Sequence, residues 1–250
     1  MFGPTDDDHA LAHRLAGEAG HLLVELRDDW FAKGLSAWAL RDEGDMRAHH
    51  FLVDAISAAR PDDGLISEEG WPDPSRLTKE RVWIVDPLDG TNEFGELGRP
   101  DWAVHVALVV RGEPVCGAVA LPVLGITYST QAPPTLPVVE RRLRVVSSRS
   151  RTTYAAHLVA EALDADIAYL GSAGAKAMAV VRGEVDVYAH SGGMYEWDSC
   201  APAAVARAAG LHVSRIDGSP LVYNQRDPWM PDFLVCRPEL AERVLSALWD

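Results

Sequence analysis

The sequence predicts an α+β half followed by an α/β half. Leucines at helical spacing open the chain, and apolar strands joined by short turns fill its middle. From residue 143 onward, short apolar strands alternate with helical segments, an order typical of α/β architecture. The proline-rich stretch 132–142 separates the two patterns. We therefore expect an N-terminal α+β domain over residues 1–138, which carries the acidic motifs, and a C-terminal α/β domain over residues 139–250.

Two amphipathic helices are expected in the first half. Residues 6–32 place leucines on one helical face, and residues 45–59 repeat the pattern until the turn sequence Pro61-Asp62-Asp63-Gly64 ends it. A buried strand is expected at 82–85, where Pro87 then stops regular pairing. Three further strands share turns short enough for an antiparallel meander; they are 101–110, 114–122 and 125–130.

The second half alternates strand and helix, and it ends in a helix. The expected strands are 143–146, 167–170, 185–188 and 233–236, and the expected helices are 150–163, 173–181, 198–209 and a final one.

Composition and charge narrow the class of function. The chain has 250 residues and a formal net charge of -14, which disfavours binding to nucleic acid or to an anionic membrane. No apolar run is long enough to cross a bilayer, and the acidic N-terminus is unlike a signal peptide. Cys116, Cys200 and Cys236 lie far apart and are expected to be reduced core residues. We expect a soluble, cytoplasmic protein without nucleic-acid or membrane partners.

Carboxylates stand at three junctions between expected elements. Asp86 and Asp89 end the strand in "WIVDPLDGTNEF", Glu68 belongs to an acidic pair after a short apolar run, and Asp198 begins the helix 198–209. Each has a structural alternative: an Asp-Gly turn, a solvated acidic loop and a helix N-cap. Three such junctions together favour an oxygen-ligated site for a hard cation such as Mg²⁺ or Mn²⁺.

Three motifs in order carry a family resemblance. "SEEG", "WIVDPLDGTNEF" and "WDSCAPAAVARAAG" resemble the signature of the inositol monophosphatase-like superfamily of metal-dependent, lithium-sensitive phosphatases, over nearly the whole chain. "GSAGAKAMAV" and "DGSPLVYNQRDP" are most similar to its CysQ-type 3'(2'),5'-bisphosphate nucleotidase branch, in the style of actinobacterial members. The resemblance implies a five-layer αβαβα sandwich, which agrees with the two halves.

The resemblance also implies a set of site residues. Two or three Mg²⁺ ions, replaceable by Mn²⁺, would be held by Glu68, Asp86, Asp89, Asp198 and the backbone carbonyl of Leu88. Thr91 would help Glu68 to hold the attacking water, and the amides of Gly90 and Thr91 would cradle the phosphate. The substrate-binding residues implied in this way are Glu68, Leu88, Asp89, Gly90, Thr91, Ser172, Lys176 and Asp198.

Asp45 is a further catalytic candidate with an open alternative. Many members of the superfamily carry P-V-T-x-A-D before the second helix, and Asp45 falls at its aspartate, but the Pro-Val-Thr part is missing from "ALRDEGDMRAHH". Asp45 therefore has two possible roles: it holds a third metal or activates water, or it is the N-cap of a helix.

Two loops near the expected site allow two interpretations each. "GSAGAK" either uses Ser172 and Lys176 to contact a second phosphate of a nucleotide or is a glycine turn with a surface lysine. In the expected loop 191–197, Met194 and Tyr195 either border the base or make ordinary loop contacts.

The activity implied is hydrolysis of a phosphate monoester. The preferred substrate is the 3'-phosphate of 3'-phosphoadenosine 5'-phosphate, giving AMP, with the corresponding phosphosulfate as a second substrate, in sulfur assimilation. The alternatives are inositol monophosphate, fructose 1,6-bisphosphate and, in another class, a non-catalytic protein that binds metal or phosphate. The sequence leaves a homodimer open.

Overall fold

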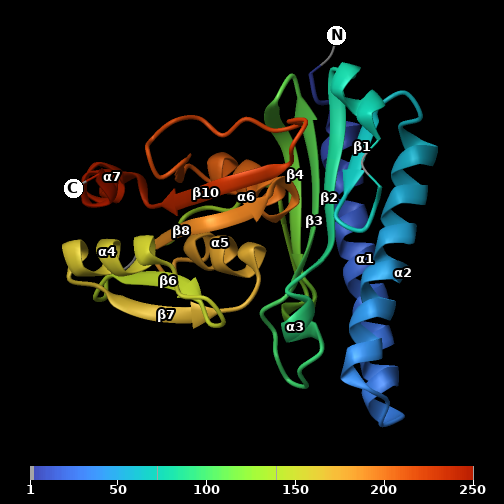
Figure 1. Cartoon of the computed structure of the whole chain (residues 1–250), viewed down its shortest axis with the longest axis horizontal. Coiled ribbons are helices and arrows are strands. Elements are labelled where there is room, and N and C mark those ends of the chain that lie inside the picture. The colour runs from blue at the N-terminus through green and yellow to red at the C-terminus, as the bar shows by residue number, and fades with distance from the viewer. Residues whose placement is uncertain (1–2, 72, 139, 250) are drawn as a thin grey trace.

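The protein is built of five layers. In the computed structural model, which describes residues 3–71, 73–138 and 140–249, two five-stranded sheets enclose a pair of helices. A further pair of helices covers each outer face (Figure 1). In layer order the helix pairs are α1 (Asp6–Ala32) with α2 (Ala37–Ala59), then α5 (Ala173–Val181) with α6 (Glu196–Ala208), then α4 (Tyr154–Leu163) with α7 (Ala241–Trp249). The predicted αβαβα sandwich is confirmed.

The first sheet contains the meander expected from the sequence. Its strands follow chain order, and only the first pair is parallel. They are β1 (Gly64–Ser67), β2 (Arg81–Asp89), β3 (Ala103–Val110), β4 (Glu113–Leu121) and β5 (Ile126–Ser129).

The second sheet mixes parallel and antiparallel strands. Strand β6 (Arg144–Ser148) pairs in parallel with β7 (Asp166–Leu170) and β8 (Val187–Tyr195), and β10 (Trp229–Cys236) lies antiparallel between β8 and β9 (His212–Ser214). The chain passes from one sheet to the other between Ser129 and Arg144, within the proline-rich region. That the two halves are separate domains stays a prediction.

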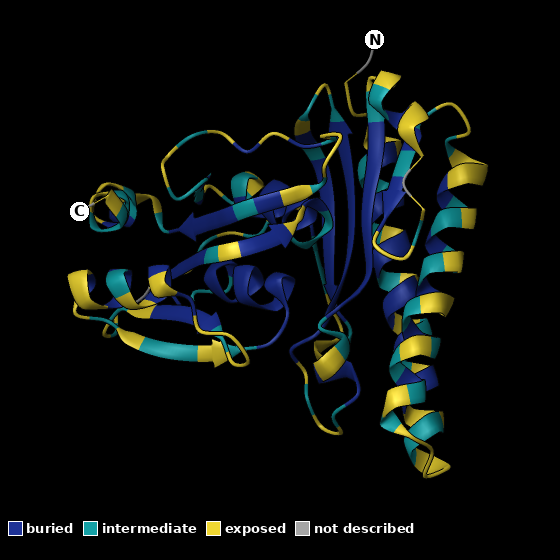
Figure 2. Cartoon of the chain, in the orientation of Figure 1, coloured by how far each residue is buried: buried dark blue, intermediate teal, exposed yellow. Residues whose placement is uncertain are grey.

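Buried residues line the interfaces between the layers (Figure 2). Helix α1 turns Leu15, Ala19 and Leu23 towards the first sheet, because residues three and four apart share one helical face. The middle helices are buried on nearly every side, as α5 shows with Met178 and its neighbouring alanines. A helix buried between two sheets needs small side chains, which explains its alanine-rich sequence.

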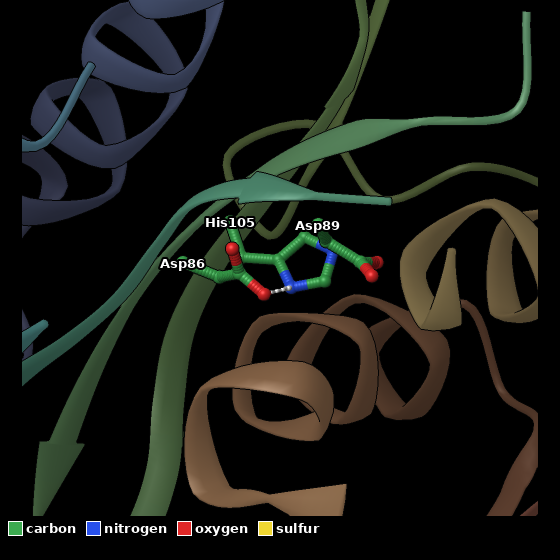
Figure 3. A group of neighbouring side chains, drawn as sticks. All are labelled: Asp86, Asp89 and His105. Carbon is green, nitrogen blue, oxygen red and sulfur yellow. Dashed lines mark ion pairs between the residues drawn. The ribbon is translucent and has the colours of Figure 1, made fainter. Parts of the chain in front are cut away.

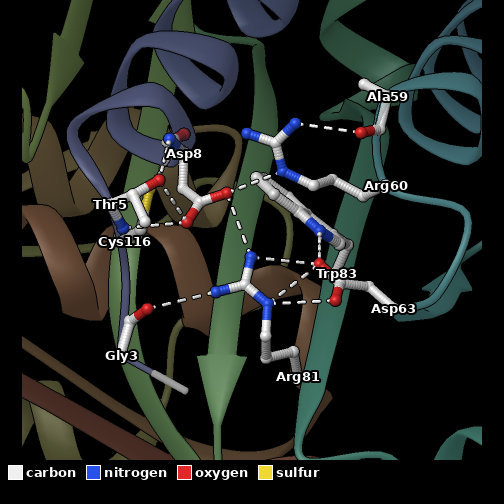
Figure 4. Close-up of polar contacts among 9 residues, drawn as sticks. All are labelled: Gly3, Thr5, Asp8, Ala59, Arg60, Asp63, Arg81, Trp83 and Cys116. Atoms are coloured by element: carbon white, nitrogen blue, oxygen red, sulfur yellow. Dashed lines mark hydrogen bonds and ion pairs between the residues drawn. The ribbon is translucent and has the colours of Figure 1, made fainter. Parts of the chain in front are cut away.

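An ion-pair network fixes the start of α1 (Figure 4). The carboxylate of Asp8 accepts hydrogen bonds from Arg60 at 2.8 Å and from Arg81 at 3.0 Å. Arg81 also pairs with Asp63, which in turn accepts the indole N–H of Trp83 at 2.9 Å. Burial acts to raise the pKa of Asp8, but hydrogen bonds from Arg60, Thr5 and Arg81 outweigh it and lower the pKa to about 2. The network therefore ties α1 and the end of α2 to strand β2.

Three features differ from the sequence predictions. Helix α2 begins at Ala37 rather than at residue 45, so Asp45 lies inside the helix and the N-cap interpretation is wrong. The expected loop 191–197 is instead the end of β8 and the start of α6. Ser191, Met194 and Tyr195 pair with β10, and the register shifts between them, where two glycines have positive φ. Helix α3 (Thr91–Phe94), strand β9 and the 3-10 helices Pro74–Thr78, Pro122–Leu124 and Pro238–Leu240 were not expected. Within the described residues, no helix combines the length and the apolar character needed to span a membrane.

Candidate active site

Strand β2 ends at the two aspartates of the central motif. Its pairing with β3 is regular as far as Asp86, is interrupted at Pro87 and Leu88, and resumes at Asp89. The Leu88 N–H donates to Asp86 Oδ1 at 3.1 Å, which closes a tight turn. Both aspartates are buried, as is Leu88. The interruption lets Asp86 and Asp89 occupy one region although they are three residues apart.

His105 lies between these two carboxylates and was not predicted (Figure 3). It is on β3, directly opposite Asp86, and is fully buried. Its Nδ1 donates to the carbonyl of Trp197 at 3.0 Å, and its Nε2 lies 3.2 Å from Asp89 Oδ2, in ion-pair contact without hydrogen-bond alignment. Burial opposes the charged imidazole, but Asp89 raises the pKa of His105.

The start of helix α5 donates three hydrogen bonds to Asp89. The Ser172 hydroxyl lies 2.5 Å from Asp89 Oδ2, and the amides of Ala173 and Gly174 lie 3.1 and 2.6 Å from the carboxylate. Burial acts to raise the pKa of Asp89, but His105, Lys176 and Ser172 together lower it to about 2. Asp89 is therefore anionic over the whole physiological range.

The close packing of the start of α5 against Asp89 and His105 requires unusual backbone conformations and small residues. Ser172 has a φ of 41°, an uncommon value for a residue other than glycine. A Cβ at Gly174 would lie 2.1 Å from His105 Nε2, so only glycine permits this approach. Gly90 has a φ of 90° and lies just before α3, where the predicted phosphate-binding amides of Gly90 and Thr91 are found.

Asp198 reaches the same region from the middle layer. It is the third residue of α6, and its Oδ2 accepts the Tyr195 N–H at 2.6 Å. The N-cap residue is Tyr195, so the sequence interpretation of Asp198 as the cap is wrong by three positions. Burial and repulsion from Asp89 raise the pKa of Asp198 to about 6.

Glu68 and Asp86 share a second region of crowded negative charge. Although Glu68 as a residue keeps much exposed surface, many protein atoms surround its carboxyl group. This desolvation and repulsion from Asp198 raise the pKa of Glu68 to about 8. For Asp86, burial and repulsion from Glu68 and Asp89 raise the pKa well above its usual value. With protein groups alone, this cluster retains protons near neutral pH.

Asp45 and Thr91 form the outer part of the cluster. The Thr91 hydroxyl lies 3.1 Å from the carbonyl of Leu88 and 3.4 Å from Asp45 Oδ1. Burial and repulsion from Glu69 raise the pKa of Asp45 to about 7. Thr91 thus connects Asp45 on α2 with the predicted backbone ligand on β2.

Lys176 is buried, so the interpretation of "GSAGAK" as a glycine turn with a surface lysine is wrong. Its Nζ donates to the carbonyls of Gly171 and Ser172 at 2.9 and 2.7 Å and lies 5.3 Å from the Tyr188 ring centroid. Burial lowers the pKa of Lys176, although Asp89 acts against this shift. The side chain holds the loop before α5 in place, and its contact with a substrate stays a prediction.

A cavity of about 590 Å³ opens beside the carboxylates. Of the predicted site residues, Glu68, Asp89, Ser172, Lys176 and Asp198 line it, whereas Asp45, Asp86, Leu88, Gly90 and Thr91 are not part of its lining. The rest of its wall includes Ser148, Ser150, Arg151, Met194, Tyr195 and Trp229. Its volume is typical of a site for a small organic ligand, for which the range is about 300–1,000 Å³.

Comparison with known proteins identifies the family. The profile of the inositol monophosphatase family matches residues 32–250. The chain belongs to the inositol monophosphatase family. It is 46% identical over 245 residues to the 3'-phosphoadenosine 5'-phosphate phosphatase of Mycobacterium bovis, covering 93% of this chain and 90% of that protein. It is 31% identical to the 3'(2'),5'-bisphosphate nucleotidase CysQ of Escherichia coli O157:H7, covering 89% and 96%.

A solved member of the family shares the fold. The crystal structure of CysQ from Bacteroides thetaiotaomicron superposes with a TM-score of 0.74 at 27% identity, covering 93% of this chain and 97% of that one. The family resemblance stated from the three acidic motifs is therefore confirmed.

The residues present fit the metal dependence of this family. Asp86, Asp89 and His105 bring one ligand atom each within 4.8 Å of one another. The raised pKa values of Glu68, Asp86 and Asp198 mark carboxylates whose negative charge the protein's own groups do not fully compensate. A divalent cation supplies such a charge, and carboxylate oxygens are its preferred ligands. The acidic cluster is thus able to bind metal.

Proposed function

We propose that the protein is a metal-dependent phosphomonoesterase that removes the 3'-phosphate of 3'-phosphoadenosine 5'-phosphate to give AMP and phosphate. The observation that carries this proposal is the 46% identity, over 93% of the chain, to a protein named for that activity. The cavity supports it, because the cavity extends past the carboxylates to aromatic and basic side chains. The corresponding phosphosulfate is proposed as a second substrate, and sulfur assimilation as the setting.

The metal is proposed to be Mg²⁺, in two or three ions, with Mn²⁺ as a substitute. Glu68, Asp86, Asp89, Asp198 and the carbonyl of Leu88 would hold these ions, all from one cluster. The bound cations supply Lewis-acid stabilisation of the phosphoryl charge and lower the pKa of water. The oxygen-rich donor set favours Mg²⁺ over softer metals.

The protein groups position the attack. Glu68 would accept the proton of the attacking water, and Thr91 would orient that water. Asp45, within reach of the Thr91 hydroxyl, would assist as a second proton acceptor. The amides of Gly90 and Thr91 would cradle the phosphate, and Ser172 and Lys176 would contact the nucleotide from α5. The oxygen of the attacking water would form a bond to phosphorus as the bond between phosphorus and the 3' oxygen breaks, and the 3' oxygen would take up a proton from solvent.

A phosphate-release panel tests the substrate and the metal together. We expect 3'-phosphoadenosine 5'-phosphate to be turned over with a kcat/KM about a hundredfold above that of inositol monophosphate or fructose 1,6-bisphosphate, the worth of one or two charge-assisted hydrogen bonds. EDTA should abolish activity, and LiCl should inhibit more than KCl at matched ionic strength. If inositol monophosphate is turned over equally well or better, the proposed nucleotide substrate is wrong, but the assignment as a phosphatase remains.

The cellular location and the oligomeric state are also proposed. The cysteines of the chain are free and buried, which fits the reducing cytoplasm proposed here as its location. A homodimer is a further hypothesis, which analytical ultracentrifugation tests by measuring the mass of the protein in solution. A non-catalytic role is disfavoured because a full set of acidic ligands accompanies the cavity.

A further inference from the structure

Arg151 is a cation of the active-site cavity that lacks an anionic partner. It follows β6, whose end faces the first sheet (Figure 1), and it lines the cavity that Glu68, Asp89 and Asp198 also line. Its Nη2 donates to the carbonyl of Gly193 at 3.3 Å. In the described parts of the chain, no carboxylate lies within ion-pair distance of its guanidinium.

Neighbouring arginines differ from Arg151 in this respect. Arg149 pairs with Glu93 at 2.6 Å and with Glu96, and these contacts join the end of β6 to α3 and to the turn that follows it. Arg142 pairs with Asp164 at 2.6 Å on the outer surface. In a chain with a net charge of -14, an arginine left unpaired in a cavity has a positive potential available for an anion.

Two hydroxyl groups accompany the guanidinium. Ser148 and Ser150 also line the cavity, and their oxygens lie 3.2 Å apart. The backbone N–H of Arg151 donates to Ser148 Oγ at 3.3 Å, which folds the segment 148–151 back on itself. Hydroxyls beside an arginine fork form a donor set that suits phosphate oxygens.

The aromatic wall of the same cavity suits a base. Tyr195 and Trp229 line it and are 46% and 51% exposed, and Tyr195 is stacked on Trp197 at 4.8 Å between ring centroids. Exposed aromatic side chains such as these provide faces on which a nucleobase stacks.

We infer that Arg151, with Ser148 and Ser150, binds the 5'-phosphate of the nucleotide while the 3'-phosphate faces the acidic cluster. This inference rests on the proposed function, since it assigns the second phosphate of that substrate. Lys176 was the cation expected from the sequence, but two of its three N–H groups already donate to carbonyls. Arg151 has more donors free, and it presents them as a planar fork.

The test compares substrates with and without the 5'-phosphate. We expect Arg151→Ala to lower kcat/KM for 3'-phosphoadenosine 5'-phosphate about fiftyfold, the typical worth of a charge-assisted hydrogen bond pair. For adenosine 3'-monophosphate the loss should be much smaller. Arg142→Ala removes an equal charge outside the cavity and is expected to change neither value. Arg151→Lys should recover part of the loss, because it restores the charge without the fork.

Binding of AMP provides a readout that does not need turnover. AMP carries only the 5'-phosphate, so calorimetry should show its Kd raised by a similar factor in Arg151→Ala and unchanged in Arg142→Ala. Equal behaviour of these two variants towards AMP would overturn the inference, as would a loss confined to Lys176→Ala. If the unmodified protein binds AMP through Arg151 but does not hydrolyse the bisphosphate, the proposed function fails and the anchor survives.

Discussion

Asp86 and Asp89 are three residues apart on one strand, yet their pKa values shift in opposite directions. Asp89 receives three hydrogen bonds from α5 and an ion pair from His105, and these contacts stabilise its anion. Asp86 faces Glu68 and Asp89 without a comparable set of donors, so its anion is destabilised. Protein groups thus compensate the negative charge of Asp89, whereas the charge of Asp86 has no comparable compensation within the protein.

Replacing Asp86 tests this division at the level of one residue. Asparagine has the shape of the protonated carboxyl group, so Asp86→Asn should fold with a Tm in EDTA equal to or above that of the unmodified protein. The increase in Tm on adding Mg²⁺ should be lost together with turnover, because a ligand is missing. A folded Asp86→Asn protein with full turnover and an unchanged Mg²⁺ response would contradict the metal mechanism.

The raised pKa values also predict how metal binding depends on pH. Glu68 and Asp198 have pKa values of about 8 and 6, so each holds a proton below its value and must lose it before it ligates a cation. Folded-state pKa values above the unfolded ones also lower the free energy of unfolding as pH rises from about 4 to 8 when no cation is added. The gain in Tm on adding Mg²⁺ should therefore grow from pH 5 to pH 8.

Calorimetry in two buffers of different ionisation enthalpy measures the protons released. We expect a net release when Mg²⁺ binds at pH 7, decreasing towards pH 9. Binding that neither releases protons nor strengthens with pH would show that these carboxylates are already ionised without the metal.

At the scale of elements, the site is assembled from the C-terminal end of β2, the N-terminal end of α5 and the first turn of α6. The sequence predicted β2 and α5 because their apolar residues form clear patterns. It predicted the carboxylates because each of them stands where an expected strand or helix begins or ends. It missed His105 because a single histidine in the apolar strand "DWAVHVALVV" has no spacing that distinguishes it from a core residue. It also missed the start of α2, where Gly44 and charged residues hide the helical period; a Cβ there would lie 2.6 Å from the Phe94 ring.

The Asp8 network tests how firmly α1 is held to the sheet. Asp8→Asn should lower the free energy of unfolding at pH 7 by about 2 kcal/mol, since the folded pKa of Asp8 lies about two units below its unfolded value. A depressed carboxyl pKa contributes stability above pH 4 that is lost as pH falls towards 2. The difference from the unmodified protein should therefore shrink over that range. Urea unfolding is the measurement, with the exposed Asp7→Asn as control. A loss that is equal in both variants, or that persists unchanged at low pH, would mean that this ion-pair network does not hold the helix.

At the scale of the whole molecule, the middle layer brings the two sheets to one cavity. The first half contributes Glu68 and Asp89, and the second contributes Ser148, Arg151, Ser172 and Asp198. Contacts between the halves hold this arrangement; Arg149 reaches Glu93, and the Gly171 amide donates to Asp101 at 2.5 Å. The sequence predicted the two halves, and the family resemblance implied the five layers and put Ser172, Lys176 and Asp198 of the second half at the site. Neither pointed to Ser148 or Arg151, which line the same cavity. Which residues after β6 face the acidic cluster depends on how the sheets pack, and this leaves no periodic pattern in the sequence.

The orientation of the nucleotide follows from this arrangement, and the position of the bond that is cut tests it most directly. The protein is incubated with 3'-phosphoadenosine 5'-phosphate and Mg²⁺, and the products are separated by ion-pair chromatography against standards of AMP and adenosine 3'-monophosphate. We predict AMP and one equivalent of phosphate, because in the proposed orientation the acidic cluster faces the 3'-phosphate and Arg151 binds the 5'-phosphate. Release of adenosine 3'-monophosphate, or of both monophosphates in similar amounts, would contradict this account of the site.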